Sequence, residues 1–247
     1  MFHKLIKGLA PVVALALAGG LAGCNVDVSV GEGKGVPLAE LDRGGDAPRE
    51  IILAGPDSVI ITRGERFDVD VSGDQEAVDA LRFHRDGTSL AVSRVKDAGK
   101  NIGTATVRLT IPSLTALTVA GSGSIEADHM AEGAEVTIAG SGSAKVAEIA
   151  VDSLELTIAG SGDFEAAGSA KTLDMTVAGS GSAKMAGLKA DTVDITIAGS
   201  GNATFASDGT VEANIVGSGD VTVTGSATCT VSALGSGKLH CSAGTGK

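Results

Sequence analysis

A Gly-Ser-Gly triplet recurs through the second half of the chain at nearly constant spacing. Successive triplets are separated by 19, 20, 19, 20, 18 and 18 residues. A period in this range, held over half a chain, is typical of stacked repeats that bury their apolar sides against one another. The first glycines of the triplets are Gly121, Gly140, Gly160, Gly179, Gly199, Gly217 and Gly235.

Apolar residues keep fixed distances from each triplet. The positions six, four and two residues before the first glycine are apolar in most repeats, as in Leu154, Leu156 and Ile158, and polar residues separate them. The positions four and six residues after it repeat the pattern, as in Phe164 and Ala166. Alternation with period two indicates strands with one buried face.

These columns predict an all-β fold, a parallel β-solenoid of about seven coils with 18–20 residues each. We expect it to be three-sided, with a short third side at Met130, Ile149 and Leu188, and right-handed, as parallel crossovers nearly always are. The triplet suits a corner because glycine tolerates positive φ and close backbone contact. A Gly/Ser linker or an ordinary β-sandwich is the alternative, but neither requires several apolar columns in register.

The composition agrees with a narrow interior of the solenoid, and the net charge makes nucleic acid an unsuitable partner. Hydrophobic residues make up 43% of the 247 residues, yet Trp and Tyr are absent and only five Phe occur, so small side chains must fill the core. The formal net charge is −11, and it becomes −13 without residues 1–23, which contain Lys4 and Lys7 but no acid. Such an acidic chain is not expected to bind nucleic acid, which requires a basic surface.

Residues 1–23 have the organisation of a lipoprotein signal peptide. Lys4 and Lys7 precede an apolar run over residues 9–21, which is short for a transmembrane helix. The run ends in Leu21-Ala22-Gly23-Cys24, which resembles the bacterial lipobox, where the cysteine is diacylated and becomes the first mature residue. An ordinary signal peptide with a chance cysteine and an uncleaved anchor are the alternatives.

The lipobox implies a membrane partner through lipidated Cys24, because two or three acyl chains anchor a protein stably. Residues 24–48 are rich in glycine and charge, which predicts a flexible tether. Asn25 stands where an Asp favours the inner membrane in Gram-negative lipoproteins. We therefore expect an exported protein of the cell envelope, anchored in the outer membrane.

Residues 49–112 precede the repeats and are predicted to form an irregular β cap over the first open edge of the solenoid. Alternating residues predict strands near 59–62, 67–71, 81–84, 90–93 and 104–111, and residues 75–81 predict a single helical turn. Asp86-Gly87 indicates a hairpin. The repeats are then assigned to residues 113–247.

The outward columns beside the triplet form the candidate binding face. Three residues before the first glycine lies a hydroxyl column that includes Thr137, Thr157, Thr176 and Thr196. Five residues before it lies an acidic column of Glu135, Glu155, Asp174, Asp194 and Glu212. Like charges at this spacing repel, so the acidic column must attract cations or have lysine neighbours.

No metal site or cofactor is expected. Calcium requires several convergent oxygen ligands, and the triplet has Ser where nine-residue calcium-binding repeats have Asp. On the second side Glu126, Lys145, Glu165 and Lys184 alternate in sign, which disfavours a slip by one coil.

Cys229 and Cys241 lie six residues before and six residues after Gly235, both in inward columns of the last repeat. In an oxidising compartment a disulfide between them would fix the last coil. The alternative is a pair of small buried hydrophobic side chains.

No pattern indicates a catalytic centre, so we expect no enzyme activity. His84, His129 and His240 fall in different columns, and no serine has the sequence context of a nucleophile elbow. The alternative function is a carbohydrate-active enzyme, a polysaccharide lyase or hydrolase on a β-helix scaffold. Such enzymes use carboxylates with Arg or Lys, but the last arginine, Arg108, precedes the repeats.

Three motifs resemble a known bacterial family. They are Val-x-x-Thr-Arg-Gly-Glu-x-Phe-Asp-Val at residues 59–69, Thr-Ile-Pro-Ser-Leu at residues 110–114, and the repeated [Val/Ile]-Ala-Gly-Ser-Gly. Over roughly residues 50–240 the chain resembles the putative auto-transporter adhesin, head GIN domain family, whose members are secreted or lipid-anchored β-solenoids. The resemblance implies a binding, adhesion or structural module, with an unknown envelope protein or surface polymer as partner. A passive spacer is a further alternative.

Overall fold

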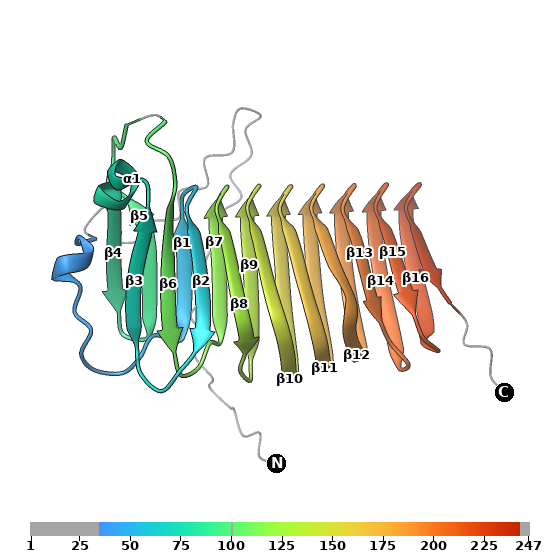
Figure 1. The fold of residues 1–247 in the computed structure, drawn as a ribbon. Coiled ribbons are helices and arrows are strands. Elements are labelled where there is room, and N and C mark those ends of the chain that lie inside the picture. The colour runs from blue at the N-terminus through green and yellow to red at the C-terminus, as the bar shows by residue number, and fades with distance from the viewer. Residues whose placement is uncertain (1–34, 100, 243–247) are drawn as a thin grey trace, which may run out of the picture.

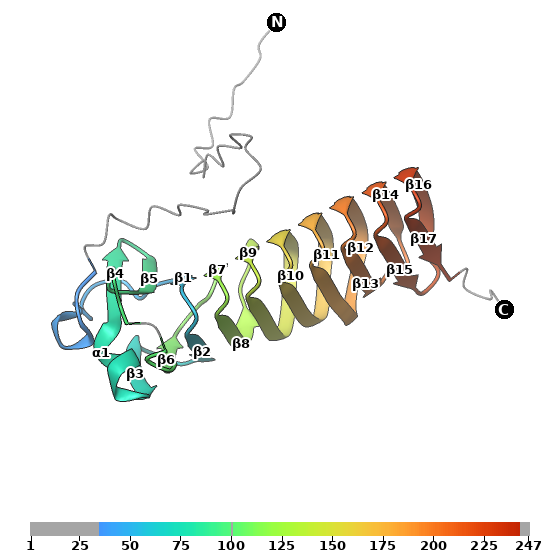
Figure 2. The same ribbon diagram turned by 90° about the horizontal axis from the view of Figure 1, so that it is seen from above.

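A computed structural model of the chain describes residues 35–99 and 101–242. The strands are stacked along one axis, from a cap that contains α1 (Gln75–Ala80) to β16 (Thr228–Gly235) at the opposite end (Figure 1). Seen from above, the coils follow one another in a single row (Figure 2). The strands after the cap are β7 (Ala116–Gly121), β8 (Ser124–Met130), β9 (Ala134–Gly140), β10 (Ser143–Gly160), β11 (Asp163–Gly179), β12 (Ser182–Gly199), β13 (Asn202–Ala206), β14 (Thr210–Gly217), β15 (Asp220–Thr224), β16 and β17 (Lys238–Cys241).

The stacked strands are parallel and in register. Thr157 pairs with Thr176, and Gly160 pairs with Gly179, so equivalent positions of neighbouring repeats lie side by side. The same register joins β7 to β9 and β9 to β10. It continues from β11 to β12, from β12 to β14 and from β14 to β16. The predicted parallel β-solenoid of about seven coils is confirmed.

The burial pattern of β10 shows why each coil has three sides. Alternating buried residues are interrupted twice by a pair of exposed neighbours, at Ala147-Glu148 and at Asp152-Ser153. Each interruption reverses which side chains face inward, so the chain must bend there. Together with the Gly-Ser-Gly corner, these two bends divide the coil into three inward faces. The buried residues are Ala144 and Val146, then Ile149 and Val151, then Leu154, Leu156 and Ile158.

The third side shortens towards the end of the chain. In β12 it still carries buried Leu188 and Ala190, as the sequence predicts for this side. After β13 the turn Ser207-Asp208-Gly209 replaces it, and the strand pairing passes directly to β14. This replacement explains why the repeat length falls from 20 to 18 residues in the last coils.

The cap contains a coil that the sequence pattern alone did not reveal. β1 (Glu50–Ala54) pairs in parallel with β7, and β2 (Ser58–Arg63) pairs in parallel with β8. On their other side they pair with β5 (Ser89–Arg94) and β6 (Ala105–Ile111), also in parallel. The first coil along the chain therefore lies second in the stack, between the β5/β6 coil and the β7/β8 coil.

Two antiparallel strands end the stack on the cap side. β3 (Asp68–Gly73) pairs with β6, and β4 (Leu81–Asp86) pairs with β5, while α1 joins β3 to β4. The predicted helical turn at residues 75–81 and the hairpin at Asp86-Gly87 are thereby confirmed. The cap covers the first open edge of the solenoid, as expected from the aggregation hazard of a bare strand.

Part of the segment predicted as a flexible tether, residues 24–48, is instead packed on the cap. From Gly35 onward the chain is described, and Val36 forms both backbone hydrogen bonds of an antiparallel bridge with Phe83. The 3₁₀ helix η2 (Leu38–Glu40) comes next, and Leu41 is buried. Arg85 donates hydrogen bonds to the carbonyl oxygens of three further residues, Asp42, Gly44 and Asp46.

The signal segment 1–23, Cys24 and Asn25 lie outside the described residues. Within residues 35–99 and 101–242, no helix has both the length and the apolar character needed to cross a membrane.

Candidate binding face

The acidic and threonine columns lie on the outward surface of the coil side that precedes the triplet. Pairing of β9, β10, β11, β12 and β14 aligns the five acids in one column, at a strand spacing of about 4.8 Å. Two residues further along each strand, the four threonines form the next column. We call these two columns the polar face: Glu135, Glu155, Asp174, Asp194 and Glu212 with Thr137, Thr157, Thr176 and Thr196.

The structure therefore brings together all nine residues that the sequence places on a binding face. All five acids are exposed, while the threonines are exposed or half-buried. Their side chains must point outward because the residues that alternate with them along the strand, such as Leu156 and Ile158, are fully buried. Their role in binding stays a prediction.

The acidic column keeps its charge in the described part of the chain, where none of its five carboxylates forms an ion pair. Nearby lysines contact other acids. Lys171 lies 2.5 Å from Asp152 at the preceding bend, and Asp208 pairs with Lys189. The sequence leaves two alternatives for the acidic column: it attracts cations, or neighbouring lysines neutralise it. These contacts agree better with the first, because the lysines pair with acids outside the column.

Glu135 is the member of the acidic column that lies nearest to the cap. Burial raises the pKa of its carboxyl group, and the negative charges of Glu155 and Glu50 raise it further. Glu50 belongs to the cap and is two coils away, because Ala116 lies between Glu50 and Glu135 in the ladder. The cap therefore extends the electrostatic surface of the repeats.

The second coil side carries a neutralised column. Glu126, Lys145, Glu165 and Lys184 are aligned one per coil, as the sequence indicates. Lys145 Nζ lies 3.8 Å from Glu165, whereas Lys184 Nζ contacts Asp163 at 3.3 Å. The two coil sides thus differ in net charge, which makes the acidic column a distinct feature and not a general property of the surface.

No three His, Cys, Asp or Glu side chains are positioned to share a metal ion among residues 35–99 and 101–242. The carboxylates of the acidic column lie one per coil along the sheet, whereas calcium requires several oxygens that converge on one point.

Cys229 in β16 and Cys241 in β17 are brought together in the last coil. Their Cα atoms are 6.5 Å apart, within the range that a disulfide bridges, and the structure pairs their sulfur atoms. Both side chains are half-buried and pack against the core.

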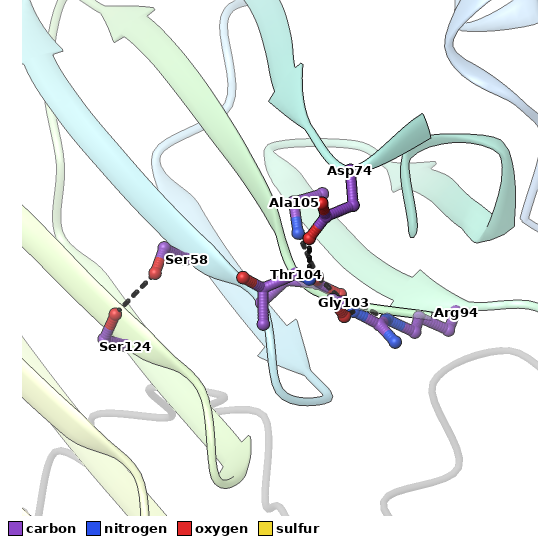
Figure 3. Close-up of polar contacts among 8 residues, drawn as sticks. Ser58, Asp74, Arg94, Gly103, Thr104, Ala105 and Ser124 are labelled. Atoms are coloured by element: carbon purple, nitrogen blue, oxygen red, sulfur yellow. Dashed lines mark hydrogen bonds and ion pairs between the residues drawn. The ribbon is translucent and has the colours of Figure 1, made fainter. Parts of the chain in front are cut away.

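A buried ion pair in the cap has no counterpart among the sequence predictions. Ala54-Gly55-Pro56-Asp57 occupies the corner that Ala120-Gly121-Ser122-Gly123 forms in the next coil, since β1 and β2 are aligned with β7 and β8. Asp57 is 1% exposed and accepts hydrogen bonds from Arg94 and from the backbone N–H of Ala105. Figure 3 shows Arg94 beside Gly103, whose carbonyl oxygen it also contacts at 2.8 Å.

This ion pair is structural. Arg94 ends β5 and Ala105 begins β6, so Asp57 holds together the two strands of the outermost coil, which lacks a Gly-Ser-Gly corner. Asp74 supports the same loop by accepting the N–H of Thr104 (Figure 3). The signal in the sequence is the apolar spacing around Gly55, where Ile51, Leu53, Val59 and Ile61 match the columns of the repeats.

A hollow of about 420 Å³ lies beside the end of β8. His129 Nδ1 contacts the Asp128 carboxylate, and its Nε2 atom is buried without a hydrogen-bond partner among the described residues. Although burial raises the pKa of Asp128, the backbone N–H of Arg63 and the His129 ring lower it by more. Ser113 also lines the hollow, and within the described part no hydrogen bond joins Ser113 to His129.

The fold and the polar face define a class of protein, the capped parallel β-solenoid with an extended polar surface. The sequence profile of the family described as putative auto-transporter adhesin, head GIN domain, matches residues 47–227, and the chain belongs to this family. The match includes the cap and most of the coils, in agreement with the resemblance found in the sequence.

Solved structures share the fold. A putative lipid binding protein from Parabacteroides distasonis ATCC 8503 is 24% identical, with a TM-score of 0.62 over 79% of this chain and 92% of that chain. A putative adhesin from Bacteroides fragilis NCTC 9343 is 18% identical, with a TM-score of 0.72 over 81% of this chain and 94% of that one. A comparison with curated proteins finds no match. At these identities the structures establish the architecture alone.

Proposed function

We propose that the chain is a lipid-anchored cell-envelope protein that binds an extended partner along its polar face. The observation that carries this proposal is the regular, exposed acidic column, which lies beside a threonine column and has no ion-pair partner in the described residues. A continuous surface of this kind fits an elongated partner better than a small molecule, which requires a concave pocket.

The partner has a predictable chemistry. Carboxylates attract basic groups, and threonine hydroxyls donate and accept hydrogen bonds. An envelope protein with basic segments, or a surface polymer with amino and hydroxyl groups, presents groups complementary to both columns. Many weak contacts at a fixed spacing add up along a polymer, which provides avidity without any single strong site.

Crosslinking in intact cells with detection by mass spectrometry tests this proposal. The test variant Glu155→Gln/Asp174→Asn/Asp194→Asn removes three charges from the polar face. The matched control Glu126→Gln/Glu148→Gln/Asp191→Asn removes three exposed charges elsewhere. We expect wild type and control to recover the same partner, and the test variant to recover at least tenfold less. Recovery of no reproducible partner, or equal recovery by both variants, would overturn the proposal.

The anchor is proposed from the lipobox, and Cys24 lies outside the described residues. Wild-type protein should incorporate labelled palmitate, and Cys24→Ser should not. Continued labelling of Cys24→Ser would refute the assignment. The outer membrane, inferred from Asn25, is then tested by separating the two membranes and locating the labelled protein.

Catalysis on a glycan is the alternative function. An acid–base pair requires two carboxyl groups with different pKa values, and in the acidic column burial and the charges of Glu155 and Glu50 raise the pKa of Glu135. If an identified glycan is turned over equally by wild type and by the triple variant of Glu155, Asp174 and Asp194, the polar face is not the catalytic centre.

Lipid binding, which the name of one similar structure mentions, is less well supported for this chain. The interior of the coils is filled by side chains, including Phe164 and Phe205, both of which are fully buried. We therefore place the lipid of this protein at its anchor and not inside its solenoid.

A further inference from the structure

The two ends of the solenoid differ. At the cap end, β3 and β4 pair antiparallel to the outermost coil, and Val36 covers part of β4. At the other end, β16 pairs with β14 and β17 pairs with β15, and no further strand covers them within the described residues. Figure 1 shows β16 as the last arrow of the row.

The free edge of β16 offers unused backbone groups. Thr228 N–H donates to Gly209 and Ser236 N–H donates to Gly217, both towards the interior of the stack. Because bonding alternates along a parallel strand, the N–H groups of Cys229, Val231 and Ala233 point to the free edge. A long strand with such an edge is a template for pairing with another strand.

Apolar side chains are exposed at this end. Val231 belongs to an inward column, yet it is 49% exposed, whereas Ala213, the same position one coil earlier, is fully buried. Leu234 on the outer surface is 74% exposed. A further strand packed against β16 would bury Val231, in the same way that β16 buries Ala213 of β14.

The charge at this end is unlike that of the rest of the protein. The formal net charge of the chain is −11, but residues 228–242 contain no Asp or Glu, and Lys238 is their only Lys or Arg. Electrostatic repulsion between two copies of this acidic chain is therefore weakest where their last coils face each other.

We propose that the free edge of β16 pairs with the β16 of a second copy, in antiparallel orientation, to form a tail-to-tail dimer. A strand edge is self-complementary across a twofold axis, because each residue then meets its counterpart on the partner strand. The twofold pairing uses the free β16 edge of both copies, so the assembly stops at two copies. The dimer places the two caps at the ends of one elongated particle, with a polar face along the coils of each half.

Sedimentation equilibrium of the full chain in density-matched detergent tests the proposal. We expect the protein mass of wild type to approach twice that of one chain as concentration rises. Val231→Lys introduces a charge at the free edge and should weaken association at least tenfold. Ala233→Pro removes an N–H that points to the free edge while it leaves the bonds to β14 intact, and it should have the same effect.

The matched control is Val216→Lys, which adds the same charge on the outer surface one coil earlier, where the side chain is 53% exposed. It should dimerise like wild type. Circular dichroism verifies that each variant is folded, and Ala233→Pro provides the test if Val231→Lys is not. A wild type that stays monomeric, forms particles larger than a dimer, or associates equally in all variants would overturn the proposal.

Discussion

The guanidinium group of Arg94 donates two hydrogen bonds to the carboxylate of Asp57, with Nε–Oδ2 and Nη2–Oδ1 distances of 2.8 Å and 2.6 Å. The pair lies where the outermost coil has a loop in place of a Gly-Ser-Gly corner. We expect Asp57→Ala to lower the free energy of unfolding by about 3–5 kcal/mol, because it leaves Arg94 and the Ala105 N–H without their partner.

Urea denaturation monitored by circular dichroism measures this effect. The control is Asp68→Ala, which breaks the exposed Arg43–Asp68 pair at 3.3 Å and should change stability by about 0–1 kcal/mol. Equal effects of the two variants would show that the buried pair does not hold the cap together.

The corner glycines are required by two constraints, and Gly160 illustrates both. Its φ is 123°, and a Cβ built on it would collide with the carbonyl oxygen of Gly140 in the preceding coil. Gly133 also has positive φ, 73°, but a Cβ there would meet no atom within 4 Å. Gly133→Ala should lower the free energy of unfolding by roughly 1 kcal/mol, the effect of positive φ alone. Gly160→Ala should lower it by more, because the added methyl group also collides with the preceding coil.

Thermal unfolding of both variants checks this difference. We expect the melting temperature of Gly160→Ala to fall clearly below that of Gly133→Ala. Indistinguishable melting temperatures would mean that the coils separate easily, and that close stacking of the corners is not needed.

The repeats could be predicted from the sequence because every coil places the same kind of residue at the same position. Leu154, Leu156 and Ile158 are buried, and Glu155 and Thr157 between them point outward, so the period-two pattern determines both the core and the polar face. The triplets determine the register, since any slip would bring side chains against glycines that have no room for them.

The order of strands in the cap could not be predicted in the same way. β1 and β2 pair with strands on both sides, and their neighbours β5 and β6 come later in the chain than they do. The Asp57–Arg94 pair joins the inserted coil to the outermost one, and its partners are 37 residues apart. No local pattern indicates such a contact. The exposed end at β16 is not apparent from the sequence either, because the burial of Val231 depends on whether another strand packs against β16.

The raised pKa of Glu135 predicts a coupling between the cap and the repeats. Burial, Glu155 and Glu50 all raise this pKa, so removing either neighbouring charge should lower it. Carboxyl carbon NMR titration of Glu155→Gln and of Glu50→Gln measures the change directly. An unchanged Glu135 pKa in Glu50→Gln would mean that the cap charge is screened from the polar face.

The same shift gives the sign of a pH effect on stability. Because the folded-state pKa lies above the unfolded value, Glu135 binds more protons in the folded protein over the interval between the two. Its contribution to stability should therefore fall as the pH rises through this interval, starting from about 4.5, the ordinary value. Glu135→Gln should remove this part of the pH dependence, by less than about 1 kcal/mol for so exposed a group.

The disulfide predicted between Cys229 and Cys241 should stabilise only the end of the solenoid. A loop of this length stabilises by about 3 kcal/mol in the chain-entropy model, and each coil contacts only its neighbours. In Cys229→Ser/Cys241→Ser, amide hydrogen exchange should quicken in β16 and β17 and stay unchanged in β10 and β11. Thiol labelling of the denatured, unreduced Cys24→Ser variant is the independent check. It should find no free thiol, and two free thiols would show that the cysteines are not bonded.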